Sequence, residues 1–272
     1  MIAFPNCKIN LGLNIIRRRI DNYHDIETVF YPLNFADVLE IIPSQLNKIE
    51  FTVTGLPLSN SDDNLCVKAY RLLKKDFPDL LFIKMHLHKA IPMGAGLGGG
   101  SADAAFTLKI LNDKFTLNLT SAQLRDYALQ LGSDCPFFIF NKPCFASGRG
   151  EHLSPINIDL SSFKIILVNP SVHIDTSQAF SGIMPKLPIK SVKEIILQPI
   201  TTWKQELIND FEIPVFENYP EIKKIKETLY EQGALYASLT GSGSTVYGLF
   251  NNIAFINTDF PVSYSIRIID LK

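Results

Sequence analysis

The residues whose types and spacing most clearly suggest chemistry form the segment 94–101, which reads Gly-Ala-Gly-Leu-Gly-Gly-Gly-Ser. Glycine lets a ligand approach the backbone N–H groups closely, and a helix predicted to begin near Ser101 adds the positive end of its dipole. A strand is predicted directly before the glycines. The order strand, glycine loop, helix favours a phosphate-binding loop over a plain flexible turn.

Three familiar phosphate loops do not fit this segment. A P-loop ends in Gly-Lys-Ser/Thr, whereas Gly99 is followed by Gly100 and Ser101. The glycines satisfy G-x-G-x-x-G by letter, but no second strand ending in an acidic residue follows the helix, as a dinucleotide-binding fold requires. The His-Arg-Asp signature of protein kinases is missing from the sequence. The loop therefore indicates a phosphate-binding protein of another class.

Asp134 and Lys8 are the residues best suited to a proton-transfer step. Asp134 follows Gly132, where a helix is predicted to end, and precedes the rigid Pro136. Lys8 lies in an otherwise apolar strand, where a long cation is usually directed at a partner, and Asn10 projects from the same face of that strand. Taken alone, however, Asp134 is equally well explained as a turn aspartate, and Lys8 as an edge-strand lysine in water.

The elements that must position these residues are mixed helices and strands. Apolar, β-branched segments at 2–16, 27–33, 37–42 and 48–54 predict an antiparallel sheet, and residues 81–88 alternate as a half-buried strand. Thr120 and Gln123 have the spacing of a capping box, which predicts a helix from Thr120 to Gly132. Residues 137–151 have the pattern of a hairpin. Later helices are expected at 203–210 and 218–232, and later strands at 163–169, 236–240, 246–251 and 263–269. This is an α+β pattern with two domains, 1–155 and 156–272.

Composition and charge exclude several functional classes. The 272 residues carry 26 basic and 27 acidic side chains, for a net charge of -1, so no global positive field favours nucleic acid or an anionic membrane. No stretch is long and apolar enough for a membrane span, and we expect no signal peptide. The four cysteines lack the spacing of zinc or redox motifs, which favours reduced thiols in a cytoplasmic protein.

The glycine segment resembles the P-x-x-x-G-L-G-x-x-x-A loop of the GHMP kinases, with Pro92, Gly96, Leu97, Gly98 and Ala102 in its places. Two other motifs of that family have counterparts here, at residues 5–12 and 239–244. Four further elements resemble the GHMP kinases that phosphorylate 4-diphosphocytidyl-2-C-methyl-D-erythritol: residues 21–24, 63–65, 132–138 and 148–151. Asn22, Ser133 and Cys135 depart from the usual Gly, Ala and Val, and we interpret them as tolerated substitutions.

The resemblance implies a fold, a reaction and a site. The fold is the two-domain GHMP kinase fold: a ribosomal-protein-like α/β domain (1–155) that binds ATP and carries the catalytic residues, and a ferredoxin-like domain (156–272) that binds substrate. The reaction transfers a phosphoryl group from ATP, with Mg²⁺, to the 2-hydroxyl of the acceptor, in non-mevalonate isoprenoid synthesis. Asp134 is implied as the base and Lys8 as its partner, and no side chain is assigned to the metal. The ATP-binding residues implied are Asn64, Pro92, Met93, Gly94, Ala95, Gly96, Leu97, Gly98, Gly99, Gly100 and Ser101.

The acceptor site implied by the resemblance lies in separate segments of the chain. Tyr23 and Phe180 are expected to stack on the cytosine ring and His24 to hydrogen-bond it. The other substrate contacts implied are Thr176 beside Phe180, Asn10, and the glycines Gly241 and Gly243 near the diphosphate. Asn64 has an equally good second interpretation, as the N-cap of the helix that starts there. We expect a monomer or weak homodimer that binds neither nucleic acid nor membrane.

Two alternative functions stay open. One is another GHMP kinase, of the homoserine or mevalonate type, with the same phosphate loop and a different acceptor. The other is a non-catalytic nucleotide- or RNA-binding module, because the first half of the fold resembles a ribosomal-protein-like arrangement. The Tyr23, His24 and Phe180 set argues against the first alternative, since a cytosine clamp is useless for a small hydroxy acid. The presence of both Lys8 and Asp134 argues against the second.

Overall fold

The computed structural model describes residues 1–58, 63–175, 179–180, 182–251 and 259–271. The chain divides into two compact units that are discontinuous in sequence. The first unit comprises Met1–Cys7, Phe35–Met93 and Gly98–Lys142, and the second comprises Lys8–Asn34, Gly94–Leu97 and Pro143–Lys272. Both units combine helices and strands, as an α+β fold requires. The functional division into 1–155 and 156–272 stays a prediction.

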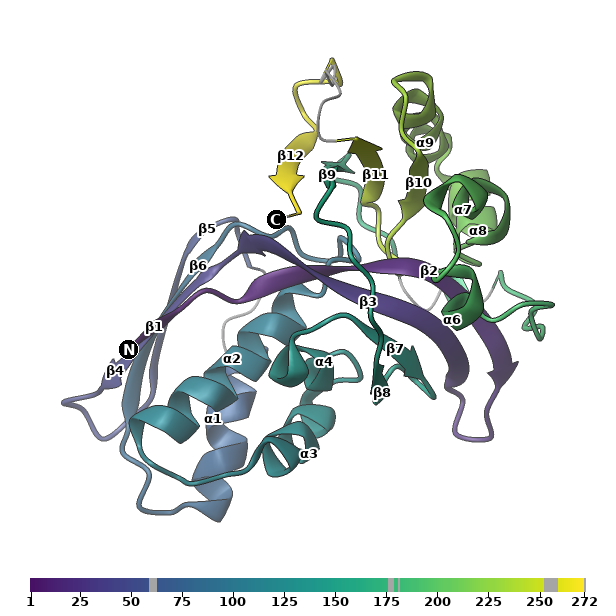
Figure 1. Ribbon diagram of the computed structural model, residues 1–272. Helices are drawn as coiled ribbons and strands as arrows, with labels where there is room; N and C mark the ends of the chain where they lie inside the picture. The colour runs from purple at the N-terminus through teal and green to yellow at the C-terminus, as the bar shows by residue number, and fades with distance from the viewer. Residues whose placement is uncertain (59–62, 176–178, 181, 252–258, 272) are drawn as a thin grey trace. The chain divides into compact units, whose positions relative to one another are not determined.

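The first unit is a four-stranded sheet covered by helices. Its strands are β1 (Ile2–Ala3), β4 (Val38–Pro43), β6 (Ile83–Lys89) and β5 (Glu50–Gly55), in that spatial order. Only the pair β5 and β6 is parallel, and α1 connects these two strands. The helices α1 (Leu65–Asp76), α2 (Gly99–Lys114), α3 (Ser121–Leu131) and α4 (Cys135–Phe140) lie together beside the sheet (Figure 1). Their shared apolar core includes Leu39, Met85, Leu87, Leu108 and Leu111.

Local sequence rules explain how several of these elements begin. Every second residue of β6 from Ile83 to Lys89 is buried, which is the period of a strand with one face in the core. The capping box predicted for α3 is present, since Thr120 accepts a hydrogen bond from the Gln123 backbone and the Gln123 side chain accepts one from the Thr120 backbone. Asn64 is the N-cap of α1, and its side chain accepts a hydrogen bond from the backbone N–H of Cys66 at 2.8 Å.

The hairpin expected at 137–151 is wrong in its first half. Residues 135–140 form α4, and the hairpin consists of β7 (Cys144–Ser147) and β8 (His152–Pro155). Pro136 suits the first turn of a helix because its ring fixes φ and its missing N–H has no partner there anyway. The rings of Phe137 and Phe138 are fully buried, so packing overrides the preference of aromatic residues for strands.

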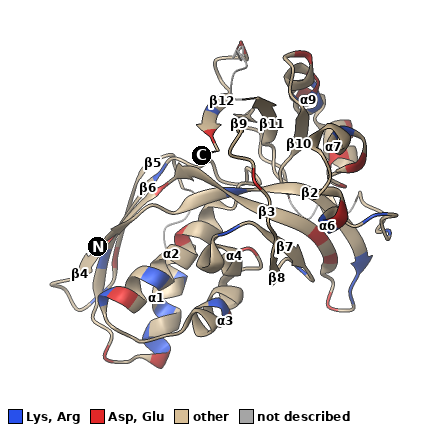
Figure 2. Cartoon of the chain, in the orientation of Figure 1, with Lys and Arg blue, Asp and Glu red and all other residues tan. Residues whose placement is uncertain are grey.

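The second unit contains two further sheets. In one, β2 (Asn6–Arg18) and β3 (His24–Ala36) form a long pair that continues into β7 and β8. In the other, the antiparallel order is β10 (Tyr236–Leu239), β11 (Val246–Asn251), β9 (Phe163–Asn169) and β12 (Ser265–Asp270). The helices of this unit are α6 (Val192–Ile195), α7 (Ile200–Glu206), α8 (Glu212–Asn218) and α9 (Pro220–Glu231). Charges of both signs occur along α9 (Figure 2). None of the helices in the described ranges is long and apolar enough to cross a membrane.

Glu212 connects three elements of the second unit. It is the first residue of α8, it is 8% exposed, and its carboxylate accepts hydrogen bonds from the Ser238 hydroxyl and the Leu239 N–H on β10, both at 3.0 Å. Lys226 on α9 donates to the same carboxylate at 2.7 Å. A single buried acid thus satisfies a backbone donor, a hydroxyl and a cation.

We expect Glu212→Leu to lower the free energy of unfolding by about 2–4 kcal/mol, because it leaves a buried N–H and an ammonium without their acceptor. The matched control is Glu227→Leu on α9, since Glu227 is 56% exposed and its pair with Lys223 is 3.8 Å long. That change should cost less than about 1 kcal/mol. Urea unfolding followed by the fluorescence of Trp203, the one tryptophan, reports on this unit. Equal losses in both variants would contradict the role given to Glu212.

Candidate active site

The glycine loop has the backbone geometry of an anion-binding turn. Gly94, Gly96 and Gly98 have φ values of 66°, 79° and 71°, in the left-handed region that other residues rarely adopt. Gly98 is the N-cap of α2 and has no side chain with which to cap it. The first N–H groups of a 16-residue helix therefore stand where a phosphate can accept them.

Two of the motifs meet within the second unit. A Cβ added at Gly96 would lie 1.9 Å from the carbonyl oxygen of Thr240, and one added at Gly243 would lie 2.0 Å from the Gly96 nitrogen. The Thr245 N–H also donates to the Ala95 carbonyl at 3.2 Å. The loop and the turn at Gly241–Gly243, both predicted as ligand contacts, are thus packed backbone against backbone.

Lys8 is buried in the second unit and directed at the loop. Its ammonium donates to the Asn10 Oδ1 at 2.6 Å and to the Gly96 carbonyl at 3.0 Å, and it lies 5.2 Å from the centre of the Phe30 ring. Lys8 and Asn10 are 3% and 2% exposed. The backbone N–H of Asn10 donates to the Thr240 hydroxyl at 3.0 Å. Lys8 is therefore no edge-strand lysine in water, and Asn10 projects from the same face as predicted.

Asp134 belongs to the first unit, at the turn between α3 and α4. It is half-buried and immediately precedes Cys135, whose thiol has a pKa raised by burial to about 12 and hydrogen-bonds the Ser101 hydroxyl. The start of α4 therefore lies beside the start of α2, where the phosphate loop ends. Because Lys8 and Asp134 belong to different units, their pairing stays a prediction.

A pocket in the first unit contains three of the residues predicted to bind ATP. It is lined by Asn64, Met93 and Gly100, together with the apolar side chains of Leu58 and Leu65 and the acids Asp63 and Asp103. Asn64 both caps α1 and lines this pocket, so its two interpretations are compatible. A pocket with both apolar side chains and a few polar groups suits a nucleotide base, which has apolar faces and polar edges.

Two of the three residues predicted to bind cytosine, His24 and Phe180, belong to one aromatic cluster in the second unit. The His24 and Phe180 rings are stacked at 4.7 Å with an interplanar angle of 13°, and Phe180 meets Phe211 edge to face at 4.8 Å. Burial, followed by the charge of Arg18, lowers the pKa of His24, which favours the neutral ring. Tyr23 is 53% exposed and lies against Arg149 instead, with the guanidinium 4.7 Å from the ring centre. Thr176 lies outside the described residues.

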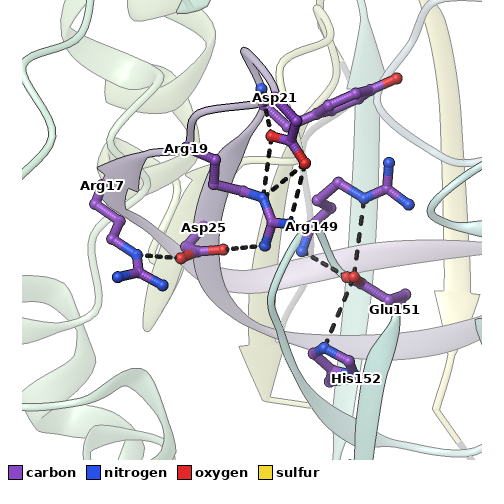
Figure 3. Close-up of polar contacts among 8 residues, drawn as sticks. Arg17, Arg19, Asp21, Asp25, Arg149, Glu151 and His152 are labelled. Carbon is purple, nitrogen blue, oxygen red and sulfur yellow. Dashed lines mark hydrogen bonds and ion pairs between the residues drawn. The ribbon is translucent and has the colours of Figure 1, made fainter.

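An arginine and carboxylate network that the sequence did not identify surrounds Tyr23. Arg19 bonds both Asp21 and Asp25, and this lowers the pKa of each carboxyl; Arg17 also bonds Asp25 (Figure 3). Asp21 accepts the Tyr23 N–H at 3.1 Å. The network fixes the turn that carries Tyr23.

A tight turn holds Arg149, whose guanidinium contacts the Tyr23 ring. The backbone N–H of Arg149 donates to Glu151 at 2.5 Å (Figure 3). The Gly148 carbonyl accepts the Ile26 N–H at 2.7 Å. The Gly-Arg-Gly-Glu motif was visible in the sequence, but nothing local to it indicated an aromatic partner.

Comparisons with known proteins agree with these features. Residues 64–142 match the GHMP kinases N terminal domain and residues 195–254 match the GHMP kinases C terminal domain. A protein of Cytophaga hutchinsonii named 4-diphosphocytidyl-2-C-methyl-D-erythritol kinase is 50% identical over 252 residues, which cover 92% of this chain and 93% of that one. One of the same name from Bacteroides thetaiotaomicron is 53% identical over 253 residues, with 92% of each chain covered.

Solved structures show the same fold. A crystal structure of 4-(cytidine 5'-diphospho)-2C-methyl-D-erythritol kinase has a TM-score of 0.75 and 29% identity and covers 92% of this chain and 90% of its own. The mevalonate kinase of Methanococcus jannaschii has a TM-score of 0.69 at 14% identity, with 93% and 92% covered, which is a likeness of fold alone. The expected two-domain GHMP kinase fold is confirmed.

We expect Gly98→Val to weaken ATP binding by about 10- to 100-fold, because a β-branched residue is strained at a φ of 71° and moves the N–H groups at the start of α2. Gly233→Val is the control: its φ is +92° and an added Cβ would meet nothing within 4 Å, so it carries similar backbone strain away from the loop. Calorimetric titration with a non-hydrolysable ATP analogue measures both. Wild-type affinity in a folded Gly98→Val protein would refute the loop assignment.

Proposed function

Because this chain belongs to the GHMP kinases and, within them, to the 4-diphosphocytidyl-2-C-methyl-D-erythritol kinase family, we propose that it phosphorylates the 2-hydroxyl of 4-diphosphocytidyl-2-C-methyl-D-erythritol with ATP. The products are the 2-phosphate and ADP, in the non-mevalonate route to isoprenoid precursors. The observation that carries a kinase function is the buried Lys8 ammonium, held by Asn10 and by the carbonyl of Gly96 within the phosphate loop. The acceptor is the one that these relatives are named for.

The proposed chemistry divides phosphate binding from proton transfer. The N–H groups at Gly98–Ser101 bind the nucleotide phosphates, and the Lys8 cation offsets negative charge near the loop. The acceptor oxygen forms its bond to the γ-phosphorus as the bond from phosphorus to the ADP oxygen breaks. The hydroxyl proton passes to the Asp134 carboxylate.

Mg²⁺ accompanies ATP in this proposal. The N–H groups of the loop suit phosphate oxygens rather than a cation, so the metal would be held by the nucleotide phosphates and water, and the Ser101 hydroxyl at the start of α2 would meet phosphate or metal. When bound, it neutralises phosphate charge. The aromatic cluster supports cytidine recognition, since the stacked pair of His24 and Phe180 provides aromatic surface and a neutral His24 can exchange hydrogen bonds with a base. We propose that the protein acts in the cytoplasm, as a monomer or weak homodimer.

The acceptor is tested by an ADP-release assay in which four compounds are offered side by side: 4-diphosphocytidyl-2-C-methyl-D-erythritol, methylerythritol phosphate without CMP, homoserine and mevalonate. We expect release with the first compound alone. Turnover of homoserine or mevalonate at a comparable kcat/KM would show instead a GHMP kinase with a different acceptor.

Asp134→Asn should lower the turnover number by about 10²–10⁴-fold while both ligands still bind, because the amide keeps the size of the side chain and cannot accept a proton. Lys8→Ala should lower the turnover number by a comparable factor. The double variant should be much less impaired than the product of the two losses, as residues that act together are non-additive. Single-turnover phosphorylation at saturating ligands measures each factor, and a wild-type rate in Asp134→Asn would remove this residue from the mechanism.

Phe180→Ala should weaken binding of the cytidine substrate by about 1–3 kcal/mol, the usual contribution of stacking between a base and an aromatic ring. The KM for ATP should change little. Phe216→Ala is the matched control, because Phe216 also packs, partly buried, on the hydrophobic core of the second unit. Steady-state KM values for both substrates separate the effects. An equal rise in the KM for the cytidine substrate in Phe216→Ala would mean that the effect comes from packing. A rise in the KM for ATP alone in Phe180→Ala would mean that Phe180 contacts the nucleotide instead.

A further inference from the structure

Three charged side chains in the first unit are buried together. The Lys89 ammonium, at the end of β6, donates to Asp103 Oδ2 at 2.8 Å and also to Asp37 Oδ2. Asp37 directly precedes β4, and Asp103 lies in the first turns of α2. The side chains of Lys89 and Asp37 are 0% exposed and that of Asp103 is 3% exposed. No part of this triad was assigned a role from the sequence.

The triad has one cation and two acids, so ionisation of both acids leaves one buried negative charge unbalanced. Such a charge costs several kcal/mol, and a buried group avoids the cost by taking up a proton. The two acids are not equivalent. Asp37 accepts from Lys89 and from the N–H groups of Ala90 and Ile91, at 2.6 and 2.9 Å. Among the described residues, Oδ1 of Asp103 has no hydrogen-bond donor.

The groups that face Asp103 act on its pKa in opposite directions, and those that favour the protonated form are stronger. Burial, as the largest effect, and the neighbouring Asp37 raise the pKa of Asp103 to about 7, against the opposing effect of Lys89. On the α1 side the neighbour is Cys66, whose thiol has a pKa raised by burial and is uncharged near neutrality. Asp103 and Asp37 are close enough for a hydrogen bond between their side chains, which two ionised carboxylates cannot make.

We propose that Asp103 works as a neutral carboxylic acid that donates its proton to Asp37 and accepts from Lys89, and that it is a positioning residue for the ATP loop. In this form the triad has no net charge, and each polar atom has a use. The inference rests on the proposed binding of ATP by the loop.

The triad can position the loop because its members contact the segments directly before and after it. Asp37 holds the N–H groups of Ala90 and Ile91, which lead from β6 into the loop, and Asp103 belongs to the helix into which the loop runs. A Cβ added at Gly99 would lie 2.8 Å from the Ile91 side chain and 3.3 Å from Lys89 Nζ, so the two ends are in tight contact. Loss of the shared proton removes the hydrogen bond between the two acids and leaves one buried negative charge unbalanced, which weakens the contact between these ends.

The direction of the pH effect follows from the raised pKa. The neutral form predominates below about pH 7, so its contribution to ATP binding and to stability is present at low pH and is lost as the pH rises through 7. Asp103→Asn should preserve the neutral arrangement at every pH, because an amide donates to Asp37 through Nδ2 and accepts from Lys89 through its oxygen.

The experiment measures kcat and the KM for ATP from pH 6 to 9 in wild type, Asp103→Asn, Asp103→Leu and the control Asp113→Asn, an exposed acid on the same helix. ATP itself titrates in this range, so the ratio of wild-type to Asp103→Asn KM is the readout. We expect that ratio to be near one at pH 6 and to rise by about three- to tenfold at pH 8.5. Asp103→Leu should raise the KM at all pH values, and Asp113→Asn should follow wild type.

Two results would overturn the proposal. One is a KM for ATP raised tenfold or more in Asp103→Asn at pH 6, which would mean that the carboxylate itself is required. The other is a ratio that does not change with pH. Two measurements need no ATP: the infrared band of a protonated carboxyl, expected in wild type at pH 6 and lost in Asp103→Asn, and the pH dependence of unfolding, expected to be weaker in that variant. If they succeed while Gly98→Val still binds ATP, the neutral acid stands and the loop assignment fails.

Discussion

The backbone contact among Gly96, Thr240 and Gly243 is the constraint on which the arrangement around Lys8 depends. A side chain at either glycine would meet backbone atoms at about 2 Å, and backbone cannot move aside as a flexible side chain can. The same packing holds the Gly96 carbonyl, which accepts the Lys8 ammonium, and the Thr240 hydroxyl, which receives the Asn10 N–H. Two motifs far apart in the chain therefore fix the position of one cation.

Each unit has a buried lysine near the glycine loop, Lys8 in the second unit and Lys89 in the first, but the two lysines have different hydrogen-bond acceptors. Lys8 donates to the amide oxygen of Asn10 and to the backbone carbonyl of Gly96. Lys89 is enclosed by two carboxyls, and its ion pair with Asp103 stabilises the contact between β6 and α2. Burial of a lysine therefore does not by itself indicate catalysis, and the acceptors around it decide its role.

Local patterns were sufficient for elements whose causes are local. The alternation of β6 and the Thr120–Gln123 capping box were visible in the sequence. The same alternation places Lys89 on the buried face of β6, which signals a partner, but Asp37 lies 52 residues away and no local rule identifies it. Likewise α4 is a helix in which Phe137 and Phe138 are fully buried, and this burial depends on segments outside α4. His24 and Phe180 are far apart in the sequence, so their stacking is visible only in the folded structure.

The departure at Asn22 shows which property of the acceptor turn matters. Its φ is 65°, a conformation that glycine adopts freely and that asparagine tolerates better than most residues. The turn is then closed by the Arg19 N–H, which donates to the Tyr23 carbonyl at 2.8 Å, and by Asp21, which accepts the Tyr23 N–H. Because these bonds define the backbone at Tyr23 and His24, a change from glycine to asparagine preserves the direction of both rings. A motif can therefore vary in its letters while the backbone conformation of its turn is kept.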